Sequence, residues 1–324
     1  MKIAVIGAGN WGKNLVRTFH SLGVLSSVMD PSEQIRSEVA KNYPDVTVFD
    51  SLEELLKSDI TAVAIATPAQ THAAIALQAF RAGKDTFVEK PMSLAISEAN
   101  ELIHAANEHG RILMVGHLLL YQPAVRWIKN YLNEGKLGEI WNIHQTRCNL
   151  GRARKVENVL WSFGVHDIAV LLSLVASPVK NVKCLGQCSL QSNIEDDVYL
   201  HLQFENGVRA HLHNSWLWPK TDRHLTIVGS QGMLVYDEIA QKVLLHKKTI
   251  SAELKNVDEG TEVVFEGSAE PLRLQLEHFL DCVKTRKEPL SHGASGLAVV
   301  EVLETASQLL QKDRENDPRI NKIV

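Results

Sequence analysis

The fold is decided by a stretch near the start of the chain, residues 2–15, which reads KIAVIGAGNWGKNL. An apolar run, Ile3–Ile6, is followed at once by Gly7, Gly9 and Gly12 in the spacing GxGxxG. In a strand–turn–helix unit the first glycine permits the tight turn, the second lets a pyrophosphate approach the backbone, and the third lets the helix pack closely on the strand. The N–H groups at the helix start then attract the phosphates. We predict a dinucleotide site here; the alternative is a purely structural glycine turn.

An acidic residue supports the dinucleotide interpretation. Asp30 lies 21 positions beyond Gly9, at the end of the next expected strand. A carboxylate at that place bonds the ribose 2′-hydroxyl and repels a 2′-phosphate. The sequence therefore predicts NAD as the cofactor, with Asn10 and Trp11 of the turn also in contact with it. Arg36 is close enough in sequence to meet the extra phosphate of NADP instead.

The first third of the chain alternates short apolar runs with segments of helical spacing. This alternation predicts a doubly wound α/β domain over residues 1–117, a Rossmann-type parallel sheet covered by helices on both faces. The expected strands are Lys2–Ile6, Leu25–Asp30, Val46–Asp50, Thr61–Thr67, Asp85–Lys90 and Arg111–Gly116.

Residues 118–324 have a different pattern and are predicted to form a second domain. From Val182 to Phe265, strand follows strand with turns such as Asn206-Gly207. Antiparallel strands combined with a few helices predict an α+β domain. The last helix, expected at residues 296–311, could pack on the first domain instead.

The composition excludes several classes of protein. The chain has 324 residues, of which 45% are apolar and 22% charged, so a sizeable core is expected. A net charge of −4 argues against nucleic-acid or membrane partners. The four cysteines form no paired CxxC array, so we expect neither a zinc cage nor disulfides, and the simplest location is the reducing cytoplasm.

The candidate catalytic residues are expected at the carboxyl end of the fifth strand. Glu89-Lys90-Pro91 stands at its carboxyl end, the edge at which open α/β sheets bind ligands. A lysine beside a nicotinamide ring could exchange a proton with the substrate. Taken alone, the same three residues could be a surface lysine that ends a strand.

Further motifs connect this tip to a known family. They are Ala66-Thr67-Pro68, Thr71-His72, Ala82-Gly83-Lys84, Phe87-Val88-Glu89-Lys90-Pro91, Val115-Gly116-His117, Gly135-Lys136-Leu137-Gly138-Glu139-Ile140, Gly164-Val165-His166-Asp167-Ile168, Glu195-Asp196-Asp197 and Gly229-Ser230-Gln231-Gly232. Together they resemble the signature of the Gfo/Idh/MocA oxidoreductases over nearly the whole chain. The resemblance implies a Rossmann domain and a second domain on a large, mostly antiparallel open sheet, and an enzyme that oxidises or reduces a CH–OH group of a sugar or polyol.

The resemblance also implies roles for single residues. Lys90 is the expected catalytic lysine, and His166 assists it from the second domain. Many family members have Asp four residues before this histidine, but here the residue is Ser162, which cannot ionise, so more of the proton chemistry falls to Lys90 and His166. The residues expected to line the dinucleotide cleft are Thr67, Pro68, His72, Glu89 and Lys90.

The substrate is predicted from a basic segment before His166. Arg147, Arg152, Arg154 and Lys155 lie within nine residues, and guanidinium groups grip phosphates or carboxylates at two points. The alternative is a solvated basic loop. This part of the chain resembles the family branch that oxidises nucleotide sugars, such as UDP-N-acetylglucosamine, to the 3-keto form. The substrate-binding candidates are Tyr121, Arg147, Asn149, Arg152, Arg154, Trp161 and Asp167.

The sequence leaves some assignments open. Asp167 points about 100° around its helix from His166, which favours a cap or structural contact. His211 and His213 share one strand face and His201 could neighbour them, but we expect a polar sheet face or subunit interface and no metal. The competing functions are a polyol or free-sugar dehydrogenase such as an inositol dehydrogenase, a non-catalytic NAD(H)-binding regulator, and an NAD-dependent glycosidase. A homodimer or homotetramer is expected from the resemblance.

Overall fold

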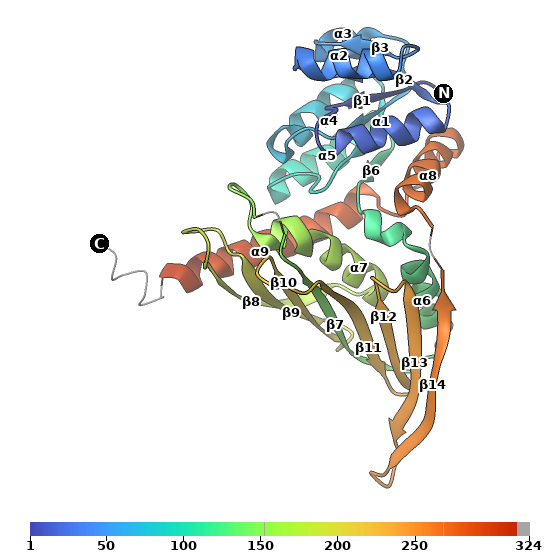
Figure 1. Cartoon of the computed structure of the whole chain (residues 1–324), viewed down its shortest axis with the longest axis vertical. Helices are drawn as coiled ribbons and strands as arrows, with labels where there is room; N and C mark the ends of the chain where they lie inside the picture. Colours follow the sequence, from blue (N-terminus) through green and yellow to red (C-terminus); the bar gives the residue numbers. More distant parts are fainter. Residues whose placement is uncertain (152, 268, 316–324) are drawn as a thin grey trace. The chain divides into compact units, whose positions relative to one another are not determined.

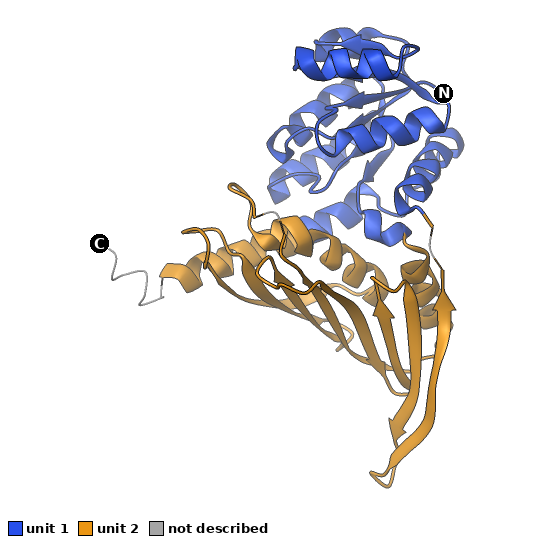
Figure 2. Ribbon diagram, viewed as in Figure 1, with its two compact units in different colours: residues 1–121, 270–300 blue, residues 122–269, 301–324 orange. Residues whose placement is uncertain are grey.

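The computed structural model describes residues 1–324 except 152, 268 and 316–324. The chain divides into two compact units (Figure 2). Unit 1 comprises residues 1–121 and 270–300, and unit 2 comprises residues 122–269 and 301–324. The boundary expected from the sequence, after residue 117, lies close to the first of these divisions, whereas residues 270–300 group with unit 1.

Unit 1 contains a six-stranded parallel sheet in the order β3-β2-β1-β4-β5-β6 (Figure 1). Its strands are β1 (Ile3–Ile6), β2 (Leu25–Met29), β3 (Thr47–Phe49), β4 (Ala62–Ile65), β5 (Asp85–Val88) and β6 (Leu113–Val115). Its helices between strands are α1 (Gly12–Ser21), α2 (Glu33–Asn42), α3 (Leu52–Lys57), α4 (His72–Arg81) and α5 (Ile96–Glu108), with short turns at η1 (Ala69–Thr71) and η2 (Leu118–Tyr121). The strand order reverses between β1 and β4. The predicted doubly wound domain is confirmed.

Local sequence explains these elements. Strands β1, β4 and β5 are buried along their whole length, as apolar strands covered on both faces must be. Ser32 and Ser51 cap α2 and α3, each accepting a backbone N–H from the first turn at 3.4 Å. Helix α8 (Pro271–Thr285), which comes late in the chain, packs on α1 and η2 and completes unit 1.

Unit 2 is built on an eight-stranded sheet in the order β14-β13-β12-β11-β7-β10-β9-β8. Its strands are β7 (Ile140–Cys148), β8 (Val179–Gln187), β9 (Asp197–Phe204), β10 (Arg209–Ser215), β11 (Asp222–Gly229), β12 (Gly232–Asp237), β13 (Lys242–Ile250) and β14 (Asn256–Glu266). All neighbouring pairs are antiparallel except β7 with β10. This confirms the mostly antiparallel sheet that the family resemblance implied.

Helices cover one face of this sheet. They are α6 (Pro123–Asn133) and α7 (Val165–Val175), the latter preceded by a π-helical turn, η3 (Leu160–Gly164) (Figure 1). The final helix, α9 (Gly293–Glu315), contributes residues to both units. No helix in the described part of the chain is long and apolar enough to cross a membrane.

The strands of unit 2 also carry a row of histidines between buried positions. His201 of β9 and His211 of β10 are register partners whose Nδ1 atoms lie 2.6 Å apart, and the ring of His144 on β7 is 4.9 Å from that of His211. The expected neighbourhood of His201 and His211 is therefore confirmed. Across the residues described, no group of three or more His, Cys, Asp or Glu side chains could hold a metal ion.

Candidate active site

The three glycines after β1 have distinct surroundings. Gly7 has φ +85°, and a Cβ there would come within 2.9 Å of Thr67. A Cβ on Gly12 would lie 1.9 Å from the carbonyl oxygen of Gly7, so only glycine allows α1 to begin so close to the turn. A Cβ on Gly9 would meet nothing within 4 Å, so this side of the turn is open. These glycines fit a pyrophosphate laid against the backbone at Gly9.

Asp30 is buried at the end of β2 and holds the turn. Its Oδ2 accepts the N–H of Ala8 and its Oδ1 accepts the N–H of Ser32, both at 2.9 Å. Arg36 donates from Nη1 to the carbonyl oxygens of Asp30 and Pro31, each at 2.9 Å. The carboxylate therefore lies where the adenosine ribose of a dinucleotide is expected, and its charge repels a 2′-phosphate.

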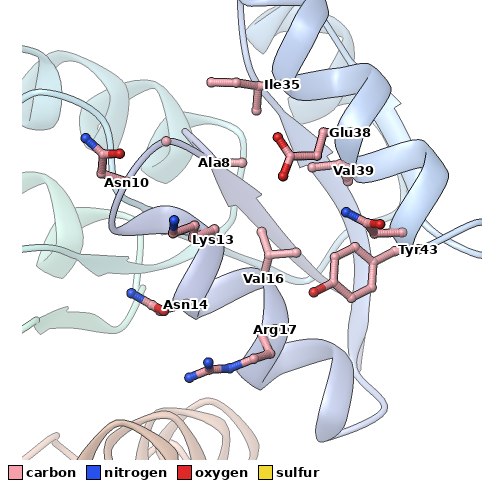
Figure 3. A pocket seen from close by; sticks show the side chains of 12 residues that line it. Ala8, Asn10, Lys13, Asn14, Val16, Arg17, Ile35, Glu38, Val39 and Tyr43 are labelled. Atoms are coloured by element: carbon pink, nitrogen blue, oxygen red, sulfur yellow. The ribbon is translucent and has the colours of Figure 1, made fainter.

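A hollow of about 390 Å³ extends from the turn along the groove between α1 and α2 (Figure 3). Its apolar side chains include Val16 and Val39, and its charged ones are Lys13, Arg17 and Glu38. Because Ala8, Gly9 and Asn10 form one end of it, the hollow adjoins the predicted pyrophosphate position.

Glu89 and Lys90 stand at the end of β5, and their side chains are organised by the glycine turn. The indole N–H of Trp11 donates to Oε1 of Glu89 at 2.5 Å, and the backbone N–H of Lys90 donates to Oε2 at 3.2 Å. A Cβ on Gly116 would lie 2.8 Å from the same Oε2, so this carboxylate is confined on three sides. Burial raises the pKa of Glu89 to about 7, although Trp11 and the charge of Lys90 oppose the shift.

Two buried imidazoles accompany Lys90. His72 is 1% exposed; its Nδ1 lies 2.8 Å from the carbonyl oxygen of Pro91 and its Nε2 lies 2.9 Å from that of Thr67, so it joins the loops that follow β4 and β5. Burial lowers the pKa of His72, and the charge of Lys90 adds to the effect. His117, which follows β6, is buried without a hydrogen-bond partner for either ring nitrogen. Burial and Lys90 lower the pKa of His117 to about 3.

These contacts show the surroundings of the residues that were expected to bind the cofactor. His72 positions the two loops from inside, and a direct contact between it and the cofactor stays a prediction. His117 belongs to the Val115-Gly116-His117 motif, but a three-residue motif does not show whether a side chain is buried, so the sequence does not predict its buried position near Lys90. At the same edge Thr67 is half-buried and Pro68 is exposed, and the hydroxyl oxygen of Thr71 lies 2.7 Å from Oγ1 of Thr67 and 2.7 Å from the carbonyl oxygen of Pro68.

In unit 2, His166 is half-buried in the first turn of α7. Ser162 lies in the preceding π-helical turn, where the extra residue per turn changes which side chains stand above one another. Such turns are frequent at functional sites. Because His166 and Lys90 belong to different units, their meeting at one substrate carbon stays a prediction.

The structure gives Arg147 and Asp167 a structural role. Nε of Arg147 donates to Asp167 at 2.8 Å, while its Nη1 and Nη2 donate to the two carboxylate oxygens of Glu238 at 3.0 and 2.7 Å. The other oxygen of Asp167, a fully buried residue, accepts from Asn214 at 2.8 Å. Asp167 thus makes the structural contact that its helical position favours. A substrate contact by these side chains has no support here, since their polar atoms are engaged by protein.

The other substrate-binding candidates lie in varied settings. Tyr121 is buried in unit 1, with its hydroxyl 3.2 Å from that of Ser291. The indole N–H of Trp161 donates to Ser307 at 2.9 Å. Asn149 is half-buried with an unpartnered Oδ1, and Arg154 is exposed on the basic loop. Arg152 lies outside the described residues.

A hydride-transferring enzyme needs a dinucleotide and a proton-exchanging side chain at the same edge of its sheet. In unit 1 the glycine turn and Asp30 suit a dinucleotide, and Lys90, the predicted proton-exchanging residue, stands at the same edge of the sheet. The fold and the site therefore define an NAD-binding oxidoreductase with a second, α+β domain.

The chain belongs to the Gfo/Idh/MocA family. Residues 1–117 match the family model described as "Oxidoreductase family, NAD-binding Rossmann fold", and residues 125–235 match the model described as "GFO/IDH/MocA C-terminal domain". The resemblance deduced from the motifs is thereby confirmed, as is NAD as the cofactor.

Relatives cover almost the whole chain. UDP-N-acetylglucosamine 3-dehydrogenase of Acidithiobacillus ferrooxidans is 24% identical over 93% of this chain and 94% of its own. Its solved structure superposes with a TM-score of 0.87, covering 97% and 98% of the two chains. The NAD-dependent scyllo-inositol 2-dehydrogenase of Bacillus subtilis is 26% identical over 90% of this chain and 88% of its own. GenD2 from gentamicin A biosynthesis, solved in complex with NAD, is 22% identical with a TM-score of 0.81, covering 98% and 94% of the two chains.

Replacing Gly9 by Ala tests the pyrophosphate position. The new methyl group meets no protein atom within 4 Å, so we expect the thermal unfolding midpoint to stay within a few degrees of the original. The affinity for NAD should fall about tenfold or more, because the methyl group blocks the approach of the phosphates. Calorimetry and thermal unfolding measure the two effects. Gly12→Ala is the contrasting variant and should destabilise the fold; NAD binding unchanged in Gly9→Ala would refute the assignment.

Replacing Arg147 by Met tests the buried ion cluster. Asp167 and Glu238 would keep buried charges without their cation, which costs about 3 kcal/mol or more of unfolding free energy. Arg209→Met is the matched control, because Arg209 is exposed on the neighbouring strand β10, and it should change stability by less than about 0.5 kcal/mol. Urea unfolding of both variants provides the measurement. Equal losses of unfolding free energy in the two variants would show that the buried ion cluster contributes no more to stability than an exposed arginine does.

Proposed function

We propose that this protein uses NAD to oxidise a secondary alcohol on the ring of a nucleotide sugar, with UDP-N-acetylglucosamine and its 3-keto product as the best match. The observation that carries the oxidoreductase part is the half-buried Lys90, which stands at the carboxyl edge of the sheet beside a carboxylate tied to the glycine turn. The residues proposed for proton exchange and for cofactor binding thus lie at the same edge of the unit 1 sheet.

Lys90 and His166 share the proton chemistry in this proposal. NAD, when bound, supplies the hydride acceptor. The hydroxyl proton of the substrate passes to the amine of Lys90 or to the imidazole of His166. The carboxylate of Glu89 accepts the backbone N–H of Lys90, and the imidazole of His72 lies 2.8 Å from the carbonyl oxygen of Pro91, so the residues on both sides of the lysine are packed in place.

The nucleotide-sugar assignment draws on the relatives and on the basic loop. The dehydrogenase from Acidithiobacillus ferrooxidans acts on UDP-N-acetylglucosamine, as its name states. Because Arg147 is engaged by two carboxylates, Arg154 and Lys155 are the exposed described cations of the loop that suit a diphosphate. The inositol dehydrogenase is a relative at similar identity, so a polyol or free sugar is the second candidate.

Self-association into a homodimer or homotetramer is part of the same proposal. The family resemblance suggests the sheet of unit 2 as the interface, and the exposed Tyr199 and the histidines of β9 and β10 lie on that sheet.

The activity is tested by following NADH absorbance with purified protein, NAD and a panel of UDP-hexosamines, polyols and free sugars. Oxidation of a secondary alcohol by NAD is uphill, so a carbonyl-trapping reagent is included in every assay. We expect turnover with UDP-N-acetylglucosamine and little with the sugar alone. Turnover that ignores the UDP group would favour the polyol or free-sugar alternative. Sugar release without net NADH would indicate a glycosidase, and NAD binding without any turnover a regulator.

Replacing Lys90 by Met should abolish turnover, because methionine cannot exchange a proton, while NAD binding stays within about threefold. Lys57→Met is the matched control: Lys57 is an exposed lysine on α3 and its loss should leave turnover unchanged. Steady-state kinetics and calorimetry measure both properties. Full activity in Lys90→Met would remove this lysine from the mechanism.

A further inference from the structure

Glu89 is a buried carboxyl group at an edge of the sheet that binds a charged ligand. It is 6% exposed, and its oxygens accept the indole N–H of Trp11 and the backbone N–H of Lys90. Gly116 approaches it so closely that a Cβ there would touch Oε2. The side chain therefore has a fixed position and no shell of water to stabilise its charge.

The sheet order places Glu89 on the nicotinamide half of the site. In a doubly wound sheet the dinucleotide lies across the point at which the strand order reverses, here between β1 and β4. Asp30 follows β2 and marks the adenosine half, whereas Glu89 follows β5 on the opposite side of the reversal. The glycine turn lies between the two, and Trp11 joins it to Glu89.

The two forms of the cofactor differ at this half by one charge. The oxidised nicotinamide ring is a cation and the reduced ring is neutral. A positive charge brought near a buried carboxyl group favours its ionised form, typically by 1 to 3 pH units at about 4–6 Å. A neutral ring brings no such change.

We propose that Glu89 distinguishes oxidised from reduced cofactor by charge: its carboxyl group loses a proton when NAD⁺ binds and keeps that proton when NADH binds. The O–H bond of the acid breaks, the proton passes to the solvent, and the carboxylate remains opposite the cationic ring. The hydrogen bonds from Trp11 and from the Lys90 backbone stabilise the ionised form and are already in place. NAD⁺ therefore binds more tightly as the pH rises, and NADH does not.

The other ionisable groups near this carboxyl group do not provide the same response. His117, following β6, has a pKa lowered to about 3 and stays neutral across the working range. His72, packed under the loops after β4 and β5, also has a lowered pKa. Lys90 is the neighbour whose proton could be confused with that of Glu89, so the experiment has to separate them.

The test counts protons released on binding, by calorimetry in two buffers of different ionisation enthalpy at pH 6 and pH 8. With the pKa of Glu89 at about 7, we expect roughly 0.4 to 1 proton released per NAD⁺ at pH 6 and far fewer at pH 8. The Kd for NAD⁺ should fall by up to about tenfold from pH 6 to pH 8. NADH and ADP-ribose, which lacks the nicotinamide, should release none and bind equally at both pH values.

Three variants assign the proton. Glu89→Gln keeps the shape of the side chain and should abolish the release while ADP-ribose binding persists, which shows an intact turn. Trp11→Phe keeps an aromatic ring but removes the donor to Glu89, so the release should move to higher pH. Lys90→Met should still release a proton, at a pH shifted upward.

The proposal is overturned if NADH releases as many protons as NAD⁺, or if Glu89→Gln releases as many as the unmodified protein. Release that persists in Glu89→Gln and vanishes in Lys90→Met would assign the proton to the lysine instead. The comparison of NAD⁺ with NADH needs no variant, so a poorly folded variant does not prevent the test. The outcome is independent of which sugar or polyol is the substrate.

Discussion

Unit 1 depends on the close approach between the start of α1 and the turn after β1. A Cβ on Gly12 would overlap the carbonyl oxygen of Gly7, so any other residue would push the helix away from the strand. The same short turn is held from β2, because Asp30 accepts the N–H of Ala8, and it is joined to β5 by the bond from Trp11. The carboxyl ends of the central strands are therefore tied to one another through the turn. A displaced helix would move the predicted pyrophosphate position and the carboxylate beside Lys90 together.

In unit 2, buried polar contacts fix the helix turn that carries His166. His166 is followed directly by Asp167, whose buried carboxylate is bonded by Arg147 of β7 and by Asn214 of β10. The first turn of α7 is therefore attached to two adjacent strands of the sheet. Gly164 contributes to the same fit, since a Cβ there would lie 2.7 Å from Oδ1 of Asn214. Ion pairs of this kind add little net stability compared with apolar packing, but they fix the position of the helix turn that carries His166, the predicted proton-transferring residue.

The sequence predicts contacts between residues that are close along the chain better than contacts between residues that are far apart along it. The glycine turn, Asp30 and the lysine tip follow from local spacing and from the rule that ligands bind at the carboxyl edge, so they were predictable. The sequence treats the basic segment as one set of cations, yet the structure divides it: Arg147 points into a buried cluster and Arg154 is exposed. The difference comes from Glu238, which is 91 residues away from Arg147 and belongs to no recognised motif. Pairing over such a separation is set by the register of the sheet, which single-sequence patterns do not contain.

At the carboxyl edge of the unit 1 sheet, burial affects the pKa of the histidines more strongly than hydrogen bonding does. His72 lies between two carbonyl oxygens, an arrangement that favours the imidazolium form, yet desolvation and Lys90 lower its pKa. His117 has no partner for either ring nitrogen, and its pKa falls to about 3. Two imidazolium ions at this edge would repel the cationic ring of oxidised NAD, whereas two neutral imidazoles do not. The burial that makes these histidines costly to charge therefore keeps two positive charges away from the predicted position of the cationic ring, where Glu89 is the neighbour that we propose compensates its charge.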